Sequence, residues 1–203
     1  MRRQLVLLPI LFGFFVMGFA DIISTALIRI EEECRLSAFA AAVLPLMIFV
    51  WFLLISIPTG ILCGKIGRKN TVLASLALTV AAMFLPFAAT AERWWIYAVS
   101  FAFLGIGNTM IQAALPALMS NVVPQEKLTA RISLGQFVKA LCAAATPVVA
   151  LFCAERLGNW KYLFLVYGAL TFVAAAWLAL SPIPREKAAA VPPSFASCVR
   201  QLA

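Results

Sequence analysis

The stretch AFAAAVLPLMIFVWFLLISIPTGILC, residues 38–63, contains no charged side chain and decides what kind of protein this is. A helix needs about 20 mostly apolar residues to cross the hydrocarbon core of a bilayer. Residues 38–63 exceed that length, and they lack the period-2 alternation that is typical of a barrel strand. Because a bilayer offers no water to satisfy peptide groups, the stretch is predicted to be a membrane-spanning helix.

Similar apolar stretches fill most of the 203-residue chain. The six predicted spans are Leu5–Ile30, Ala38–Cys63, Thr71–Ala91, Trp94–Ser120, Ile132–Ala154 and Tyr162–Ser181. Hydrophobic residues make up 64% of the chain and charged residues 12%, whereas a soluble domain is about 25% charged. We therefore predict an all-α membrane protein, with a six-helix transmembrane bundle over residues 1–182 and the start of a cytoplasmic linker over residues 183–203.

Basic residues are distributed unevenly between the two ends of these spans. If the N-terminus is cytoplasmic, the inner segments hold Arg2, Arg3, Lys65, Arg68, Lys69, Lys127, Arg131, Arg185, Lys187 and Arg200, and the outer loops hold Arg29, Arg35, Arg93, Arg156 and Lys161. This asymmetry follows the positive-inside rule, so the net charge of +8 is explained by orientation. No basic stripe interleaved with aromatic residues indicates nucleic-acid binding. We expect the cell inner (plasma) membrane, with both termini in the cytoplasm.

Several classes of chemistry have no support in the sequence. The chain has no histidine, which removes His-based triads and haem ligation. Its five cysteines show no C-x-x-C spacing, and no glycine-rich phosphate loop is present. An enzyme is therefore the least favoured class, and no cofactor or metal is expected.

Strongly polar side chains occur inside three of the predicted spans. Ionisable groups at bilayer depth are costly and so mark functional sites. The residues concerned are Asp21 in the first span, Asn108 and Gln112 in the fourth, and Gln136 and Lys139 in the fifth. We expect them to converge on one cavity, with Asp21 carrying a proton and the other four binding substrate, while the third and sixth spans stay peripheral. The alternative is that these side chains only join helices through interhelical hydrogen bonds.

The loop after residue 60 is the sharpest local motif. Its residues are Gly60, Gly64, Lys65, Gly67, Arg68 and Lys69 in the stretch GILCGKIGRK. The first two glycines, one turn apart, allow close helix approach. Gly67 permits a tight turn, and the basic residues are expected to hold the loop at the cytoplasmic face.

This spacing resembles the signature G-x-x-x-D-R/K-x-G-R-K/R between helices two and three of the major facilitator superfamily. The resemblance implies a loop that takes part in conformational change. Gly64 stands where the family has an acid that belongs to a cytoplasmic charge relay, so the resemblance does not supply that relay here.

Two further stretches resemble the fucose permease branch of the superfamily. They are Leu104–Gly107 followed by Ala113–Pro116, and Leu134–Phe137. The resemblance implies that the chain corresponds to the first six of twelve helices. The branch's acid before Ala113 is replaced by Gln112, and its acid in helix one aligns near Thr25, one turn beyond Asp21.

The function expected from these features is secondary transport of a small hydrophilic solute, a sugar, coupled to a proton or other cation by alternating access. The partners would be the lipid bilayer, the solute, a proton and a second six-helix bundle. Two alternatives stay open: a truncated half-bundle that does not transport, and a drug-type exporter.

Overall fold

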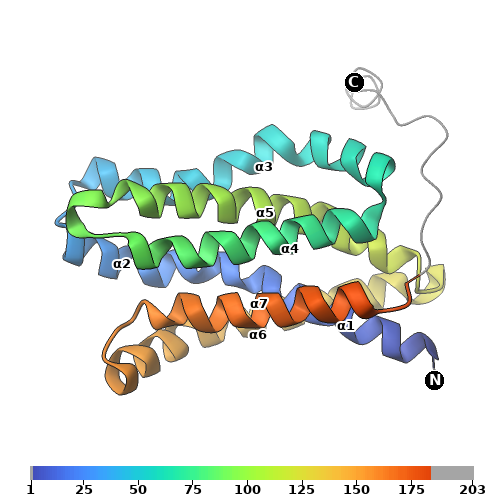
Figure 1. The fold of residues 1–203 in the computed structure, drawn as a ribbon. Helices are drawn as coiled ribbons and strands as arrows, with labels where there is room; N and C mark the ends of the chain where they lie inside the picture. Colours follow the sequence, from blue (N-terminus) through green and yellow to red (C-terminus); the bar gives the residue numbers. More distant parts are fainter. Residues whose placement is uncertain (1, 184–203) are drawn as a thin grey trace.

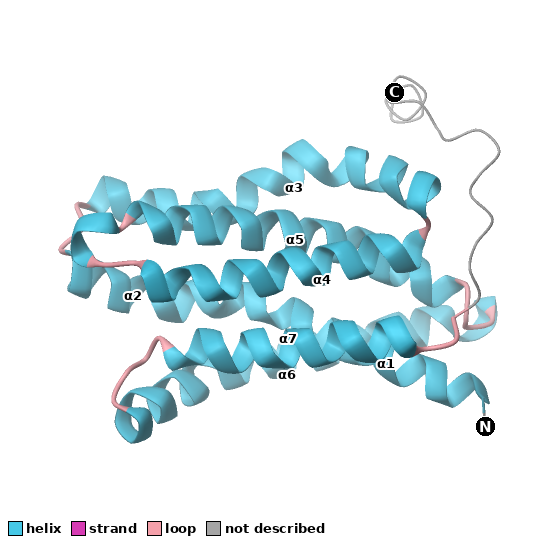
Figure 2. Ribbon diagram, in the orientation of Figure 1, coloured by secondary structure: helices cyan, strands magenta, loops and turns pink. Residues whose placement is uncertain are grey.

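The computed structural model describes residues 2–183, with side chains from Val6 onward, as helices that run roughly side by side (Figure 1). Its elements are α1 (Arg2–Met17), the 3-10 turn η1 (Gly18–Asp21), α2 (Ile22–Cys34), α3 (Ala38–Ile66), α4 (Arg68–Phe84), the 3-10 turns η2 (Leu85–Ala88) and η3 (Ala91–Arg93), α5 (Trp95–Ser120), α6 (Gln125–Leu157) and α7 (Tyr162–Leu180). Over this described part, helices are joined by short loops (Figure 2). The expected linker falls outside the described residues.

Six spans are long and apolar enough to cross a membrane: Val6–Cys34, Ala38–Ile66, Arg68–Ala88, Trp95–Ser120, Gln125–Leu157 and Tyr162–Leu180. The prediction of an all-α protein with six transmembrane helices is therefore confirmed, and the chain is a multi-pass membrane protein.

The first span is not one continuous α-helix, as its apolar run predicted. The turn η1 separates α1 from α2. At this turn a Cβ on Gly18 would lie 2.8 Å from the carbonyl oxygen of Lys139 and 2.8 Å from Cys142 Cβ. Glycine is needed here because the backbones of the first and fifth spans touch, as is common where membrane helices cross. Beyond the turn, α2 continues to Cys34, so residues 31–33 form part of its end rather than a loop.

The fifth span also differs, because α6 begins at Gln125 rather than near Ile132. Pro124 precedes it in an extended conformation, with φ −58° and ψ 147°, and marks the start of the helix. The polar first turns of α6 continue the helix beyond its apolar run. An apolar run reports the thickness of the hydrocarbon, whereas a helix ends where the backbone conformation changes.

Helix α5 lies at the centre of the bundle, against α3, α4 and α1. Two glycines let its neighbours approach closely. A Cβ on Gly105 would lie 2.6 Å from the Ile48 carbonyl oxygen of α3, and one on Gly107 would lie 2.6 Å from Thr79 Oγ1 of α4. Lipid tails are as apolar as leucine, so close packing of this kind is what holds membrane helices together.

Helices α3 and α6 are less enclosed. In the most apolar window of each span, 56% of α5 is buried, but only 22% of α6 and 17% of α3. These two helices expose large apolar side chains, such as Phe49 and Leu53 on α3 and Phe137 and Phe152 on α6.

Candidate functional site

Most hydroxyl groups in the spans are satisfied by their own helix. Thr79 donates to Ser75 O at 2.9 Å, and Thr109 donates to Gly105 O at 2.9 Å. Thr146 Oγ1 lies 2.8 Å from the Tyr167 hydroxyl of α7, which joins two helices. Such bonds account for the hydroxyls without any ligand.

The five polar residues predicted as a site behave differently. Within residues 2–183, the side chains of Asp21, Asn108, Gln112, Gln136 and Lys139 form no hydrogen bond or ion pair. Asp21 and Gln136 are exposed, Gln112 and Lys139 are half-buried, and Asn108 is only 6% exposed. Their polar atoms are thus left without protein partners in that range.

Helix contacts place these residues in one layer of the bundle. A Cβ on Gly18 would lie 2.8 Å from Lys139 O, so Lys139 lies one turn from the level of Asp21. Leu115 would touch a Cβ on Gly13 at 3.1 Å. Because α1 and α5 are antiparallel, Asn108 lies about 10 Å from Leu115 along the axis, near the level of Asp21.

The remaining two residues, Gln112 and Gln136, lie one helical turn from Asn108 and Lys139 respectively. The five residues thus lie within about two helical turns of one another along the bundle axis, and their side chains form no hydrogen bond with one another.

A hollow of about 540 Å³ lies between α2 and α6, beginning one turn beyond Asp21, and none of the five residues lines it. It is lined by Ser24, Thr25, Ile28, Arg29, Glu32 and Pro147. The α2 residues in this set recur at helical spacing, so they continue the face of Asp21 along α2. Ser24 and Thr25 follow Asp21 at i+3 and i+4, and Arg29 and Glu32 extend the same face to the end of α2.

Helix α6 has two exposed faces of different character. One carries large apolar side chains: Phe137, Leu141, Val148 and Phe152. The other carries small or polar ones: Gln136, Ala140, Ala144 and Pro147. The first suits lipid tails, and the second includes the wall of the hollow. Exposure in this helix therefore has two separate causes.

The basic motif binds helix ends at one end of the bundle. Arg68 Nη1 donates to Ala117 O at 2.7 Å, to Ser120 Oγ at 3.0 Å and to Asn121 Oδ1 at 2.6 Å, at the C-terminus of α5. Lys69 Nζ donates to Ala179 O at 3.0 Å and Ser181 O at 2.8 Å, at the C-terminus of α7. Both cations meet carbonyl groups at the C-terminal end of a helix, which is the negative end of its dipole.

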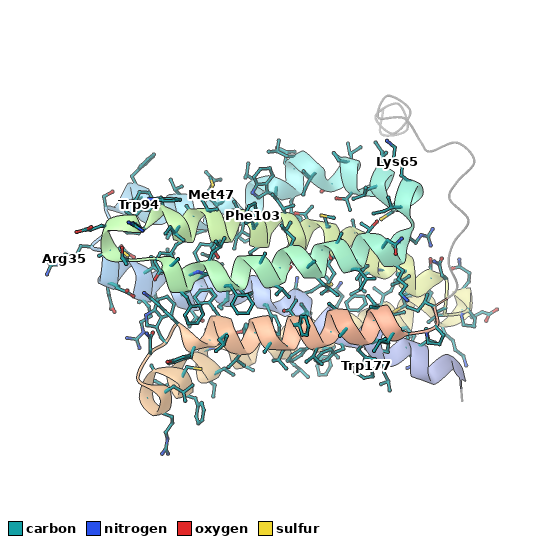
Figure 3. All side chains as sticks on the ribbon, in the orientation of Figure 1. Arg35, Met47, Lys65, Trp94, Phe103 and Trp177 are labelled. Atoms are coloured by element: carbon teal, nitrogen blue, oxygen red, sulfur yellow. The ribbon has the colours of Figure 1, made fainter. Side chains whose placement is uncertain are left out.

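The structure agrees with the expectation for one glycine of this motif and disagrees with that for another. Gly67 has φ +86°, which confirms the tight turn. The expected close approach at Gly60 is wrong, since a Cβ there would meet nothing within 4 Å among the described residues. Lys65 is exposed, at the end of the bundle that also holds the N-terminus (Figure 3).

The opposite end, where Figure 3 places Arg35 and Trp94, is held by another cation. Lys161 Nζ lies 2.7 Å from Glu33 Oε1, donates to Ala89 O at 3.4 Å and lies 5.7 Å from the centre of the Tyr97 ring. Burial lowers the pKa of Lys161, but its interactions with Glu33 and Tyr97 together outweigh burial, and the net pKa is raised. One ammonium therefore links α2, α5 and the loops after α4 and α6.

Comparison with known proteins agrees with this architecture. The model of the Major Facilitator Superfamily matches residues 10–200. The chain belongs to this superfamily. Its members are transporters rather than a class of enzyme.

Two solved sugar symporters share the fold. A variant of the E. coli Fucose:proton symporter, FucP, matches with a TM-score of 0.76 at 18% identity, covering 100% of this chain and 56% of that one. The proton:xylose symporter XylE, bound to 6-bromo-6-deoxy-D-glucose, matches with a TM-score of 0.71 at 18% identity, covering 90% and 45%. The chain thus spans about half of each, and it has the six-helix N-terminal bundle of the family fold.

A curated relative, the "Gentisate transporter" of Corynebacterium glutamicum, is 25% identical over 132 residues, which are 64% of this chain and 29% of that protein.

Proposed function

We propose that the chain forms the N-terminal bundle of a secondary carrier that moves a small hydrophilic solute, a sugar, together with a proton by alternating access. The observation that carries this proposal is the layer of unpaired polar side chains, which lie within about two helical turns of one another. Polar groups in a membrane span are costly unless they meet another polar group. A hydroxylated solute would supply the hydrogen bonds that the protein leaves unmade.

Roles within this layer follow from the chemistry of each side chain. Asn108, Gln112, Gln136 and Lys139 would bind the solute, since amides and an ammonium match hydroxyl and ring oxygens. Asp21 is the carboxylate of this layer and would carry the proton. The loop formed by Gly60, Gly64, Lys65, Gly67, Arg68 and Lys69 would move with the change between inward-facing and outward-facing states.

A second bundle would complete the solute path. Carriers of this kind bind solute between two bundles near the midplane, and the sugar symporters that this chain resembles are about twice as long. The exposed small and polar face of α6 fits such a partner. In the cell inner membrane, the positive-inside rule would place both termini and the Lys65 loop in the cytoplasm.

A carboxylate-bearing solute is a second candidate. Lys139 is a half-buried ammonium without an ion-pair partner among the described residues, and the curated relative is named for gentisate, an aromatic hydroxy acid. A charge in this position would gain most from an anionic partner.

Transport assays separate these candidates. The full-length carrier would be reconstituted in proteoliposomes with an imposed inward proton gradient, and uptake of L-fucose, D-xylose and gentisate would be measured. We expect uptake of a sugar that a protonophore abolishes. Uptake of gentisate alone would favour the second candidate, and uptake of none of the three would contradict the proposed function.

A further inference from the structure

Two unsatisfied polar atoms belong to the neighbouring helices α3 and α5. Among the buried side-chain atoms of the described residues, Trp51 Nε1 and Asn108 Oδ1 have no hydrogen-bond partner. Trp51 belongs to α3 and Asn108 to α5. An indole N–H can only donate, and an amide oxygen can only accept. The two vacant groups are therefore complementary.

The packing at Gly105 brings these two groups to the same place. A Cβ on Gly105 would lie 2.9 Å from Trp51 Cδ1, the ring carbon bonded to Nε1, and 2.6 Å from Ile48 O. Residues three apart on a helix have Cβ atoms about 5–6 Å apart. The indole nitrogen thus lies beside the turn of α5 that carries Asn108, although the two groups do not bond to each other.

We propose that Trp51 is a solute-binding residue that, together with Asn108, holds one hydroxyl of the transported solute. A hydroxyl can accept from the indole N–H while donating to the amide oxygen. An oxygen that bridges two partners at about 2.8 Å spans up to about 5–6 Å between them. The proposal rests on the proposed function and adds a residue of α3 to the site.

The chemical class of ligand follows from this arrangement. A methyl group or a ring ether in the same position would leave the indole donor or the amide acceptor unpaired, and sites that bind a hydroxyl reject analogues that lack it. The pair therefore selects solutes with a free hydroxyl at one position of the ring, and it disfavours the apolar cargo of a drug-type exporter.

The position of Asn108 links this pair to the rest of the site. It lies near the level of Asp21, in the same layer as the other unpaired polar groups. Trp51 itself is half-buried while its nitrogen is fully enclosed, so a solute hydroxyl would reach the N–H when α3 and α5 move apart in the transport cycle.

The test compares Trp51→Phe with the wild type in the full-length carrier, using whichever of L-fucose or D-xylose is transported and its monodeoxy analogues. Phenylalanine keeps an aromatic ring but removes the donor. We expect Trp51→Phe to weaken binding of the parent sugar by about tenfold or more, as expected for one lost hydrogen bond. One deoxy analogue should bind the wild type equally weakly, and Trp51→Phe should cause no further loss for that analogue.

Controls distinguish the possible results. Trp95→Phe changes an exposed tryptophan of α5 and should leave sugar affinity unchanged. The indole N–H resonance that disappears in Trp51→Phe should shift in the wild type on addition of sugar, which tests the contact even if the variant folds poorly. A lower melting temperature with unchanged sugar affinity would assign the pair to an ordered water and overturn the inference. If the wild type takes up no sugar, the proposed function fails with it.

Discussion

Helices α5 and α6 follow each other in the chain and both span the membrane, yet they are packed in opposite ways. Helix α5 meets backbone on two sides, with Gly105 against α3 and Gly107 against α4. Helix α6 packs along one side and exposes two others, one large and apolar, one small and polar. In a membrane protein, exposure alone therefore does not identify a lipid-facing surface. The size and polarity of the exposed side chains are also needed to distinguish a surface that faces lipid from one that lines a solute path.

The strongest test of this difference is to add the same bulk to each helix. Gly105→Leu should destabilise the bundle by about 3 kcal/mol or more, because the new Cβ meets the fixed backbone of Ile48. Ala144→Leu, on the exposed face of α6, should fold normally. Thermal unfolding in detergent measures both. Equal losses in the two variants would remove the distinction between the helices.

A smaller effect is expected at the C-terminal end of α5. Arg68→Met removes a cation that donates to Ala117 O, Ser120 Oγ and Asn121 Oδ1, and should cost about 2 kcal/mol. Arg68→Lys should recover only part of this stability, since an ammonium lacks the planar fork of donors. Lys65→Met, in the same loop but exposed, is the matched control. If Lys65→Met lost as much stability as Arg68→Met, this explanation would be contradicted.

The sequence could predict the spans because apolar length is a property of the chain itself. It could not predict the turn at Gly18, which depends on the carbonyl of Lys139 in a distant span, nor the start of α6 at Gln125, which lies outside the apolar run. The structure places Lys139 one turn from the level of Asp21, and the predicted site and the roles of both residues stay predictions.

The sequence analysis did not select Trp51, because a tryptophan in an apolar stretch is interpreted as an apolar packing residue. Only the packing of the helices shows that its nitrogen has no hydrogen-bond partner. The arginine and lysine of the basic loop were found by their spacing, but their contacts with the ends of α5 and α7 depend on how the helices are arranged.

At the opposite end of the bundle, around Lys161, the expected effect is smaller and depends on pH. Lys161→Met should lower stability by about 1 kcal/mol at pH 8, because it removes a partly exposed ion pair with Glu33. The pKa of Lys161 is raised in the folded state, so its contribution is fully present below the ordinary lysine pKa of about 10.4 and is lost as pH rises through the folded value. The difference between variant and wild type should therefore shrink above about pH 10.5. A constant difference across that range would show that packing, not charge, stabilises this end.

Changes at the unpaired polar residues Asp21 and Lys139 are expected to have the smallest effect on stability and the largest on transport. Asp21 is exposed and its side chain has no partner among the described residues, while Ser24 donates to its backbone oxygen rather than to its carboxylate. Asp21→Asn should therefore leave the free energy of unfolding within about 0.5 kcal/mol of the wild type. The amide cannot carry a proton, so solute exchange should persist while uptake is no longer driven by a proton gradient.

Lys139→Met keeps the length of the side chain without its charge and should weaken solute binding instead. Ser24→Ala is the control for the wall of the hollow. If Asp21→Asn and Lys139→Met lost stability but transported normally when folded, Asp21 and Lys139 would serve only to join helices. The interpretation of these residues as part of a solute path would then be wrong.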